Sequence, residues 1–359
     1  MPRVSKEAPH VLVTGAGGSI AVNLTRSLKK TSRRLMLFGC DSSRYFIHLA
    51  ETEEKAVIPS AAENEAYLQG IQKLIQHWKI DVVFPSNINE ILVLARHRHE
   101  LGARVLLPDL KSIEIGADKW RTFEEFQKAG LPVPRTELIR EPKDVDHAFA
   151  QFGEPVWFRG RGIPGRGVGV ASLPAKAIEE AKGWIQFHDA WGHMTAAEFL
   201  PGDNLTWMGL WKEGELIASQ GRKRVAYVIP HVSPSGVTGA PAVSHTVSDE
   251  RLNDLGPRAM LALDAKYNGV GFVDFKCDGK GNPLITEVNV GRLGTTHHFY
   301  TIAGANFPYW YVQLALGELP QNAKPHNVVA PDLYWIRSLD AGPVLIGRDQ
   351  LDRYGKPSR

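Results

Sequence analysis

The spacing of apolar and polar positions alternates between two periods along the first hundred residues. Short apolar runs predict strands at 10–14, 35–39, 81–85 and 103–107. The segments between them have helical periodicity at 19–30, 65–78 and 88–101. In the second of these, Leu68, Ile71 and Ile75 fall on one stripe of a helix. Strands that alternate with helices predict a small parallel sheet covered on both faces.

The pattern changes after Pro108, where strands begin to follow one another directly. Further strands are predicted at 155–159, 195–199, 205–211, 215–220 and 333–337, and further helices at 120–129, 178–188, 251–267 and 303–316. Successive strands without intervening helices indicate antiparallel pairing. The fold class is therefore α/β overall, with α+β character in the second part of the chain.

Residues 270–290 form the most informative stretch. Two apolar-alternating strands flank a turn rich in Asp, Gly and Asn, which predicts a hairpin. Asp274 lies on the first strand, and Glu287 and Asn289 lie two residues apart on the second, so the period of a strand places both on one face. Two carboxylates and an amide oxygen suit Mg²⁺, a hard cation that takes oxygen ligands. A solvated polar face is the alternative interpretation.

Two glycine-rich segments follow strands. Gly15, Gly17 and Gly18 open the helix at 19–30, and Asp41 ends the next strand, where it could contact a ribose. This context permits a dinucleotide site, although Ile20 breaks the G-x-G-x-x-G pattern. A tight strand-to-helix turn that needs glycine for packing is the simpler interpretation.

The second glycine-rich segment, at 160–169, follows Arg159 and also contains arginines. Glycine lets backbone N–H groups close over phosphate oxygens, and arginine adds a forked cationic donor. A phosphate-binding loop is therefore predicted. An RG-rich nucleic-acid segment or a linker is the alternative, which the closely flanking strands and the lack of interleaved aromatic residues disfavour.

Two smaller features become informative when they are considered together with the hairpin and the glycine-rich segments. Lys119 follows a possible N-cap, Asp118, at the start of a helix. Residues 197–202, Ala-Glu-Phe-Leu-Pro-Gly, end a strand with a turn, where backbone C=O and N–H groups could meet the edge of a flat heterocycle. Each feature alone is ordinary.

Composition limits the range of partners. The 359 residues carry a net charge of +3, with 43% hydrophobic and 23% charged residues, which gives no sign of a nucleic-acid partner. No apolar run has the length of a membrane span, and the polar start with Glu7 is a poor secretory signal. The two cysteines, Cys40 and Cys277, are expected to be reduced thiols. We therefore expect a cytoplasmic protein without a membrane or nucleic-acid partner.

Taken in order, these features resemble the ATP-grasp superfamily over about residues 10–320. Within it the chain looks most like the synthetase unit of the carbamoyl-phosphate synthetase large subunit and the carboxylate–amine ligases of that branch. The resemblance implies a Rossmann-like pre-ATP-grasp domain at 1–110, which usually binds no dinucleotide, and an ATP-grasp domain at 111–320. Within the latter it implies a lid subdomain at 111–195 and the metal and nucleotide site at 196–320. Residues 321–359 would be a C-terminal extension.

The resemblance also implies roles for single residues. Lys119 and Arg159 would hold ATP phosphates, and Arg292 would join Arg159 at the reacting acyl phosphate. The remaining implied positions are the lid glycines Gly165, Gly167 and Gly169, the adenine contacts Glu198 and Leu200, and the metal ligands Asp274, Glu287 and Asn289. Asn204 stands where the family often has a ribose-binding Glu, and the family's Glu-x-Asn-Pro-Arg appears here as Glu287-Val288-Asn289-Val290-Gly291-Arg292.

The resulting expectation is an ATP-dependent ligase that forms a carbon–nitrogen bond. ATP, with Mg²⁺ or alternatively Mn²⁺, would convert a small-molecule carboxylate into an acyl phosphate, which an amine or similar nucleophile would attack. A homodimer is one expected assembly. Three alternatives stay open: carbamoyl-phosphate-synthetase-like phosphorylation of a carboxy or carbamate substrate, an NAD(P)-dependent oxidoreductase that uses Gly15–Gly18, and a nucleotide-binding regulatory protein without turnover.

Overall fold

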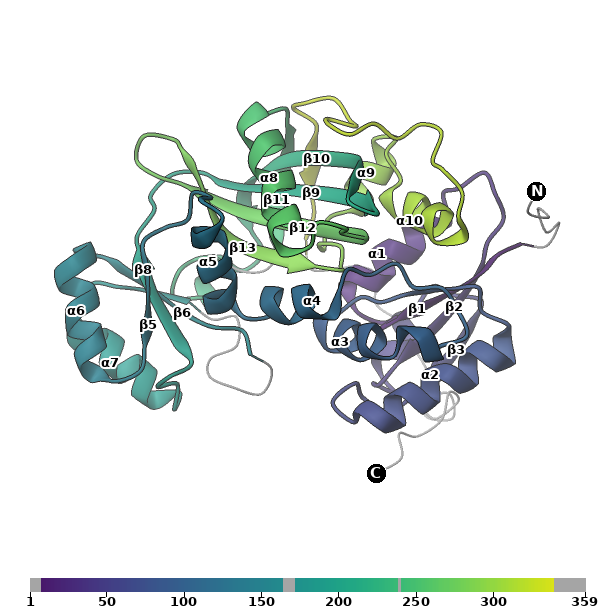
Figure 1. The fold of residues 1–359 in the computed structure, drawn as a ribbon, viewed down its shortest axis with the longest axis horizontal. Coiled ribbons are helices and arrows are strands. Elements are labelled where there is room, and N and C mark those ends of the chain that lie inside the picture. The colour runs from purple at the N-terminus through teal and green to yellow at the C-terminus, as the bar shows by residue number, and fades with distance from the viewer. Residues whose placement is uncertain (1–7, 164–171, 238–239, 339–359) are drawn as a thin grey trace.

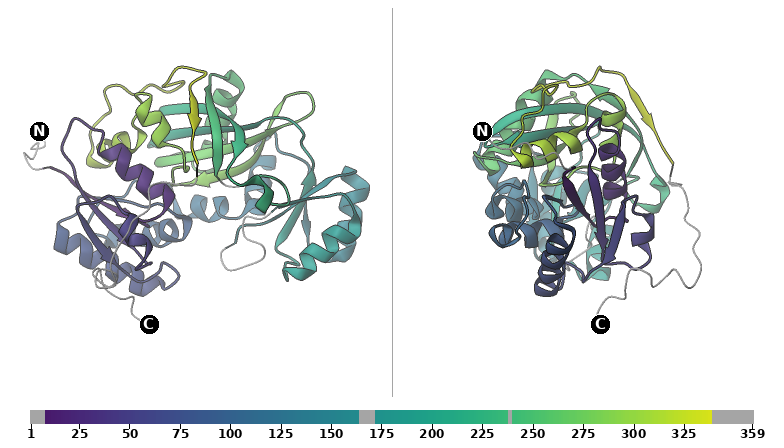
Figure 2. Two further views of the ribbon diagram at one scale, coloured as in Figure 1. Left: turned by 180° about the vertical axis from the view of Figure 1, so that it is seen from behind. Right: turned by 90° about the vertical axis from the view of Figure 1, so that its right-hand side faces the viewer.

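The computed structural model describes residues 8–163, 172–237 and 240–338, which form three β-sheets with flanking helices (Figure 1). A parallel sheet at the N-terminal end and a small antiparallel sheet lie at opposite ends of a larger sheet (Figures 1 and 2). The expected mixture of α/β and α+β organisation is therefore confirmed. No helix among the described residues combines the length and apolarity needed to cross a bilayer.

The N-terminal sheet has the strand order β3-β2-β1-β4, with parallel pairing throughout. Its strands are β1 (His10–Thr14), β2 (Met36–Asp41), β3 (Glu54–Val57) and β4 (Val82–Phe84), and its helices are α1 (Ser19–Leu28), α2 (Asn64–Trp78) and α3 (Ile88–Arg96). The near-continuous apolar runs of β1, β2 and β4 are buried, as strands covered on both faces require.

The prediction of a strand at 103–107 is wrong. Only an isolated bridge between Val82 and Arg104 forms there. The N–H of Leu106 donates instead to the hydroxyl of Tyr311, at 2.8 Å, so it is not available to a sheet ladder. The residues of this run are apolar because they are buried, not because they form a strand. Leu106 and Leu107 belong to the two large apolar cores.

The small sheet has the order β5-β8-β6-β7 and is antiparallel. Its elements are β5 (Thr136–Ile139), α6 (Pro142–Phe152), β6 (Val156–Gly160), β7 (Ser172–Ala175), α7 (Ile178–Phe187) and β8 (Met194–Glu198). The two helices cover one face and share a separate apolar core with the strands (Figure 1). The apolar pattern predicted β6, β8 and α7, whereas β5, β7 and α6 were not predicted.

The large sheet has the order β13-β12-β9-β10-β11-β14. Its strands are β9 (Asn204–Lys212), β10 (Glu215–Tyr227), β11 (Pro241–Val247), β12 (Gly269–Cys277), β13 (Pro283–Val290) and β14 (Tyr334–Ile336). The accompanying helices are α4 (Leu110–Gly116), α5 (Lys119–Lys128), α8 (Glu250–Leu263), α9 (His298–Ile302) and α10 (Phe307–Leu316). The predicted hairpin at 270–290 is confirmed as β12 and β13.

Three predicted boundaries were wrong in this unit. The helix expected at 251–267 ends at Leu263, followed by the C-cap residue Asp264. Strand β10 continues seven residues beyond Gln220, to Tyr227, because both β9 and β11 pair with its second half. The helix expected at 303–316 begins only at Phe307, since the side chain of Asn306 accepts a hydrogen bond from the N–H of Tyr309 and caps the helix there. The preceding residues form the short helix α9.

The apolar cores continue between the N-terminal sheet and the large sheet. Helix α10 packs against β4, where the rings of Phe84 and Tyr311 stack with centroids 3.9 Å apart. One buried cluster contains residues of β1 and α2 together with Trp207, Trp211 and Val288 of the large sheet. This shared burial connects the N-terminal sheet firmly to the sheet that carries the hairpin.

A buried carboxyl group lies at the carboxyl ends of β1 and β4. Glu90 is 6% exposed, and its carboxylate accepts a hydrogen bond from the Thr14 hydroxyl at 2.6 Å. Burial raises the pKa of Glu90 from 4.5 to about 7, although the hydrogen bonds from Thr14 and the Ser86 N–H oppose the increase. The folded state therefore binds a proton that the unfolded state releases at lower pH.

We expect this group to make the protein less stable as the pH rises. Between pH 4.5 and 7 the folded state holds more protons, so the free energy of unfolding falls with pH, by about 3 kcal/mol in total. Glu90→Gln keeps an acceptor for Thr14 and removes this titration. Denaturant unfolding at pH 5 and pH 8 measures the effect: the wild type should lose stability relative to the variant. An equal change in both proteins would contradict the prediction.

Candidate functional site

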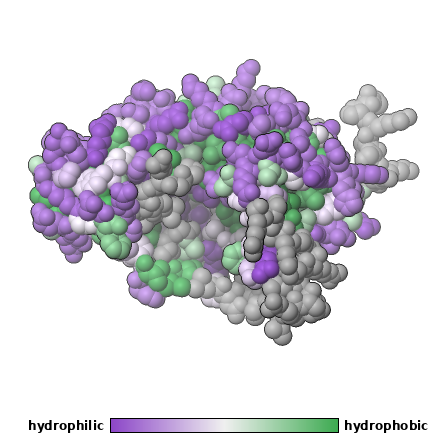
Figure 3. All heavy atoms as spheres, turned by 90° about the horizontal axis from the view of Figure 1, so that it is seen from below, coloured by the Kyte–Doolittle hydropathy of each residue, from purple (hydrophilic) through white to green (hydrophobic). Residues whose placement is uncertain are grey.

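A cavity of about 360 Å³ lies between the small sheet and the large sheet. Strands β6 and β8 supply one wall, and β10, β12 and β13 supply the other. Seen from below, the molecular surface is hollowed between the small-sheet lobe and the rest of the protein (Figure 3). Among the predicted site residues, those that line this cavity are Lys119, Arg159, Glu198, Leu200, Asp274, Glu287, Asn289 and Arg292.

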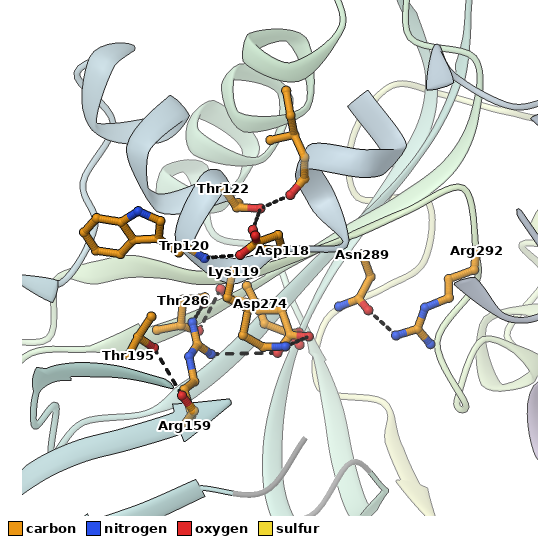
Figure 4. Close-up of polar contacts among 12 residues, drawn as sticks. Asp118, Lys119, Trp120, Thr122, Arg159, Thr195, Asp274, Thr286, Asn289 and Arg292 are labelled. Atoms are coloured by element: carbon orange, nitrogen blue, oxygen red, sulfur yellow. Dashed lines mark hydrogen bonds and ion pairs between the residues drawn. The ribbon is translucent and has the colours of Figure 1, made fainter. Parts of the chain in front are cut away.

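The three predicted metal ligands come together on the β12–β13 hairpin. Asp274 lies directly opposite Glu287 in the antiparallel register, beside a register shift between Asp274 and Phe275. Asn289, two residues after Glu287, is buried, and its side-chain oxygen accepts a hydrogen bond from Arg292 (Figure 4). The hairpin therefore gathers two carboxylates and an amide oxygen at one wall of the cavity.

Glu287 is the electrostatic centre of this wall. Its carboxylate oxygens lie 3.6 Å from Lys119 Nζ and 3.9 Å from an Arg159 guanidinium nitrogen. Burial on its own would raise the pKa of Glu287, yet the pKa stays below its usual value because nearby cations, led by Lys119 and Arg159, outweigh burial. Glu287 is therefore a carboxylate, the form that binds a metal ion.

Lys119 and Arg159 are held from separate elements. Asp118 caps helix α5 by accepting a hydrogen bond from the N–H of Trp120 at 3.0 Å, as predicted, and also forms an ion pair with Arg161. The N–H of Lys119 donates to the carbonyl of Arg161 at 2.8 Å. Arg159 donates to the Thr286 carbonyl (Figure 4). These contacts fix both residues beside the first residues of the glycine-rich segment, 160–161.

Two further cavity arginines were missed at the sequence level. Arg222 and Arg224 lie on β10 and face the cavity, whereas Lys223 points to the other face and lies 2.7 Å from Asp203. Arg224 forms an ion pair with Asp274 and donates to the Thr206 hydroxyl at 3.0 Å. The signal was present in the alternation Arg-Lys-Arg, which in a strand puts the first and third side chains on one face.

These arginines differ in their electrostatic surroundings. Burial and the neighbouring cations Arg224 and Arg337 lower the pKa of Arg222, with partial compensation from Tyr300 and Asp274. Arg224 is desolvated too, but its pKa is raised because Asp274 and Tyr227 favour the charged form. Both remain cations at neutral pH.

The other end of the cavity is more apolar. Glu198 and Leu200, the predicted adenine contacts, lie here beside Trp157 and Phe199, whose ring centroids are 6.4 Å apart. The Glu198 carboxylate is held by the Arg135 N–H at 2.8 Å and by the Arg135 side chain at 2.9 Å. Asn204 lies at the same end. An apolar slot with fixed polar edges can hold a flat heterocycle.

The donor set fits a metal ion shared with phosphate. Among the residues described by the structure, no group of three or more His, Cys, Asp or Glu side chains is placed to hold a metal ion. Asp274, Glu287 and Asn289 supply only part of an octahedral oxygen shell, and Mg²⁺ commonly completes such a shell with water and substrate phosphate oxygens. The predicted lid residues Gly165, Gly167 and Gly169 lie outside the described residues.

Neighbouring segments of the protein pack against the N-terminal glycine turn. The carboxylate of Asp41 accepts the N–H of Gly17 at 3.0 Å, so this acid caps the turn. A Cβ at Gly17 would collide with the carbonyl of Phe46, and Gly15 has a φ of 57°, in the left-handed region. Close packing and a positive φ thus account for the glycines.

We therefore expect no NAD(P)H binding at this turn. The N–H of Gly17, which a pyrophosphate would need as a donor, is already bound by Asp41, and Phe46 packs directly against Gly17. Titration of the purified protein with NADH and NADPH up to millimolar concentration, followed by cofactor fluorescence, measures this. Stoichiometric binding that Asp41→Ala abolishes would contradict the prediction and favour the oxidoreductase alternative.

Comparison with known proteins agrees with this geometry. The chain is 26% identical over 206 residues to the D-alanine–D-alanine ligase of Laribacter hongkongensis, a match that covers 56% of this chain and 65% of the relative. It is 28% identical over 202 residues to the D-alanine–D-alanine ligase of Nitrosospira multiformis, covering 53% and 61%. The matches thus span less than two thirds of the length of these two relatives. No protein-family model matches the chain.

Solved structures match nearly the whole chain. The biotin carboxylase domain of Hydrogenobacter thermophilus 2-oxoglutarate carboxylase, a dimer with MgADP, ADP and bicarbonate, has a TM-score of 0.68 at 19% identity, covering 90% of this chain and 73% of that one. The L-amino acid ligase of Bacillus licheniformis has a TM-score of 0.65 at 15% identity, covering 88% and 76%. Carboxyaminoimidazole ribonucleotide synthase from Aspergillus clavatus, complexed with ATP, has a TM-score of 0.66 at 17% identity, covering 89% and 79%.

The fold and the cavity define the class. This chain has the ATP-grasp fold, and the relatives and structural neighbours named above are ATP-grasp enzymes. The sequence-based resemblance to this superfamily is confirmed. The D-alanine–D-alanine ligases and the L-amino acid ligase among them are carbon–nitrogen ligases, the class of enzyme that the sequence predicted.

Proposed function

We propose that this protein is an ATP-dependent ligase that activates a small-molecule carboxylate as an acyl phosphate for attack by an amine or a similar nucleophile. The observation that carries the proposal is the convergence of Lys119, Arg159 and Glu287 in one cavity, with contacts of 3.6 and 3.9 Å. Cations beside an ionised carboxylate suit the binding of a metal–triphosphate complex.

The residues divide into roles along the cavity. Glu198 and Leu200 would border adenine, and Lys119 and Arg159 would bind the phosphates. Gly165, Gly167 and Gly169 would belong to the lid over them. Asp274, Glu287 and Asn289 would hold Mg²⁺, which would bridge phosphate oxygens and neutralise the charge that develops during transfer.

The ion pairs of the cavity fit such a role. Lys119 and Arg159 neutralise Glu287, and Arg224 neutralises Asp274. Asp274 and Glu287 would hold a divalent metal ion, whose charge would replace that of the cations now paired with them, and Lys119 and Arg159 would then pair with phosphate oxygens. Arg292, which holds Asn289, would then reach the acyl phosphate with Arg159.

Acid-stimulated ADP formation is the direct test. Purified protein would be incubated with MgATP and single amino acids, dicarboxylic acids and hydroxy acids, with and without an amine, and ADP would be measured. We expect at least one acid to raise ADP formation well above the background ATPase rate. If calorimetry shows MgATP binding but no acid stimulates turnover, the regulatory-protein alternative is favoured.

Several finer points are also part of the proposal. We propose a cytoplasmic location, which the two buried free cysteines Cys40 and Cys277 support. Mn²⁺ would substitute for Mg²⁺ because both accept oxygen ligands. A homodimer is proposed because the matching biotin carboxylase domain is one. We retain the division into domains 1–110 and 111–320, with its parts 111–195 and 196–320, and an extension from 321.

A further inference from the structure

The charges that line the cavity are unequal in number and in pairing. Among the residues that the structure describes, six cationic side chains line it, against three carboxylates. Three of the cations are paired with the carboxylates of the hairpin: Lys119 and Arg159 with Glu287, and Arg224 with Asp274. The third carboxylate, Glu198, is held by Arg135. The other three cations, Arg222, Lys276 and Arg292, form no ion pair within 4 Å with a carboxylate of the residues that the structure describes.

Arg222 is the most confined of the unpaired cations. Its side chain is 5% exposed, lines the cavity and donates to the hydroxyl of Thr296. Among the residues that the structure describes, no carboxylate lies within 4 Å of its guanidinium. The acid that influences it, Asp274, is already bound by Arg224 and Thr206.

A second arginine, Arg337, fixes the loop that contains Thr296, the hydrogen-bond acceptor of Arg222. Arg337 donates to the hydroxyl of Thr295 at 3.0 Å and to the Thr295 carbonyl at 3.3 Å. Its Nε–H donates to the carbonyl of Pro241 at 3.0 Å, so all three nitrogens of the guanidinium are hydrogen-bonded. The segment 294–296 is thereby positioned beside Arg222, at the end of the cavity that also contains Arg292.

Burial of a guanidinium whose only hydrogen-bond acceptor is a hydroxyl is unfavourable unless an anion binds its other N–H groups and neutralises its charge. Desolvation of a charge costs several kcal/mol, and the planar fork of arginine matches carboxylate and phosphate oxygens. A purely structural arginine would be expected to saturate backbone carbonyls, as Arg337 does. Arg222 instead keeps donors available at the cavity wall.

We propose that Arg222, together with the Thr295–Thr296 segment, binds a second anionic group of the acid substrate, so that the substrate carries an anion besides the carboxylate that is phosphorylated. This inference rests on the proposed ligase function and names its substrate class. Arg292 faces the reacting carboxylate, and Arg222 holds the second group. The second group is a carboxylate or a phosphate, since the same donors bind both.

The first test is binding, because it does not require turnover. Calorimetry with the full chain, saturated with MgADP, would compare succinate and O-phosphoserine with the monoanions acetate and propionate. We expect the better dianion to bind at least ~10-fold more tightly than either monoanion, the scale of one good charge-assisted contact. Tighter binding of succinate identifies a carboxylate subsite, and tighter binding of O-phosphoserine identifies a phosphate subsite.

Variants of β10 then locate the preference. Arg222→Met removes the guanidinium at similar volume and should reduce the dianion preference to about one, and Arg222→Lys should retain part of it. Lys223→Gln is the matched control, because it removes one positive charge from the next residue, which faces away from the cavity. This control should keep the full preference. If Arg222→Met does not fold, the lysine variant and the wild-type comparison still decide.

The outcomes separate this inference from the proposed function. Equal binding of dianions and monoanions by the wild type, or a preference that survives in Arg222→Met, would overturn the second-anion subsite. Monoanion-stimulated ADP formation alongside such a result would leave the ligase function in place. A dianion preference that depends on Arg222, in a protein without acid-stimulated turnover, would support the subsite and contradict the catalytic proposal.

Discussion

Glu287→Gln should lower ATP turnover by at least ~10²-fold while the fold is retained. The substitution removes the negative charge at nearly constant volume. The wild-type carboxylate lies 3.6 Å from Lys119 and 3.9 Å from Arg159, so the neutral amide leaves both cations without their counterion and removes the proposed metal ligand. The rate of ADP formation at saturating MgATP measures the effect.

The control for Glu287→Gln is Glu215→Gln, at the exposed start of β10 and away from the cavity. It should keep the wild-type rate. Thermal unfolding of both variants, which we expect to be close to the wild type, separates a catalytic effect from a folding defect. Near-normal ADP formation by a folded Glu287→Gln protein would disprove the metal-ligand assignment.

Arg159→Ala should have the second largest effect and should change both kinetic constants. Arg159 is the next-to-last residue of β6 and is held by Thr286 and Glu287, so its charge is fixed before nucleotide binds. If it contacts the transferred phosphoryl group, its removal weakens ATP binding and also transition-state stabilisation. We expect a higher KM for ATP, a lower kcat, and a loss of roughly 10²-fold in kcat/KM.

Arg121→Ala is the matched control for this arginine. Arg121 lies on α5, close in sequence to Lys119, but its side chain is exposed to solvent. Both kinetic constants should stay at their wild-type values in this variant. A change in the KM for ATP alone after Arg159→Ala would show that Arg159 contributes to binding but not to the transfer step, and its catalytic assignment would then be withdrawn.

The sequence by itself determined the features that depend on local periodicity. The two-residue period of a strand was sufficient to place Asp274, Glu287 and Asn289 on one hairpin, and the hairpin forms as predicted. The N-cap at Asp118 likewise follows from residues adjacent in the chain. The order of these motifs predicted the ATP-grasp fold, since that order reflects the path of the chain through the whole domain.

Only the tertiary structure decided which distant groups meet. Arg222 and Arg224 became visible as cavity residues once β9 and β12 placed β10 beside Asp274. The packing of Phe46 onto Gly17 decided that the N-terminal glycines serve a turn. The hydroxyl of Tyr311 decided that 103–107 is not a strand. Each outcome depends on a contact between segments far apart in sequence, and the apolar pattern reports burial without naming the partner.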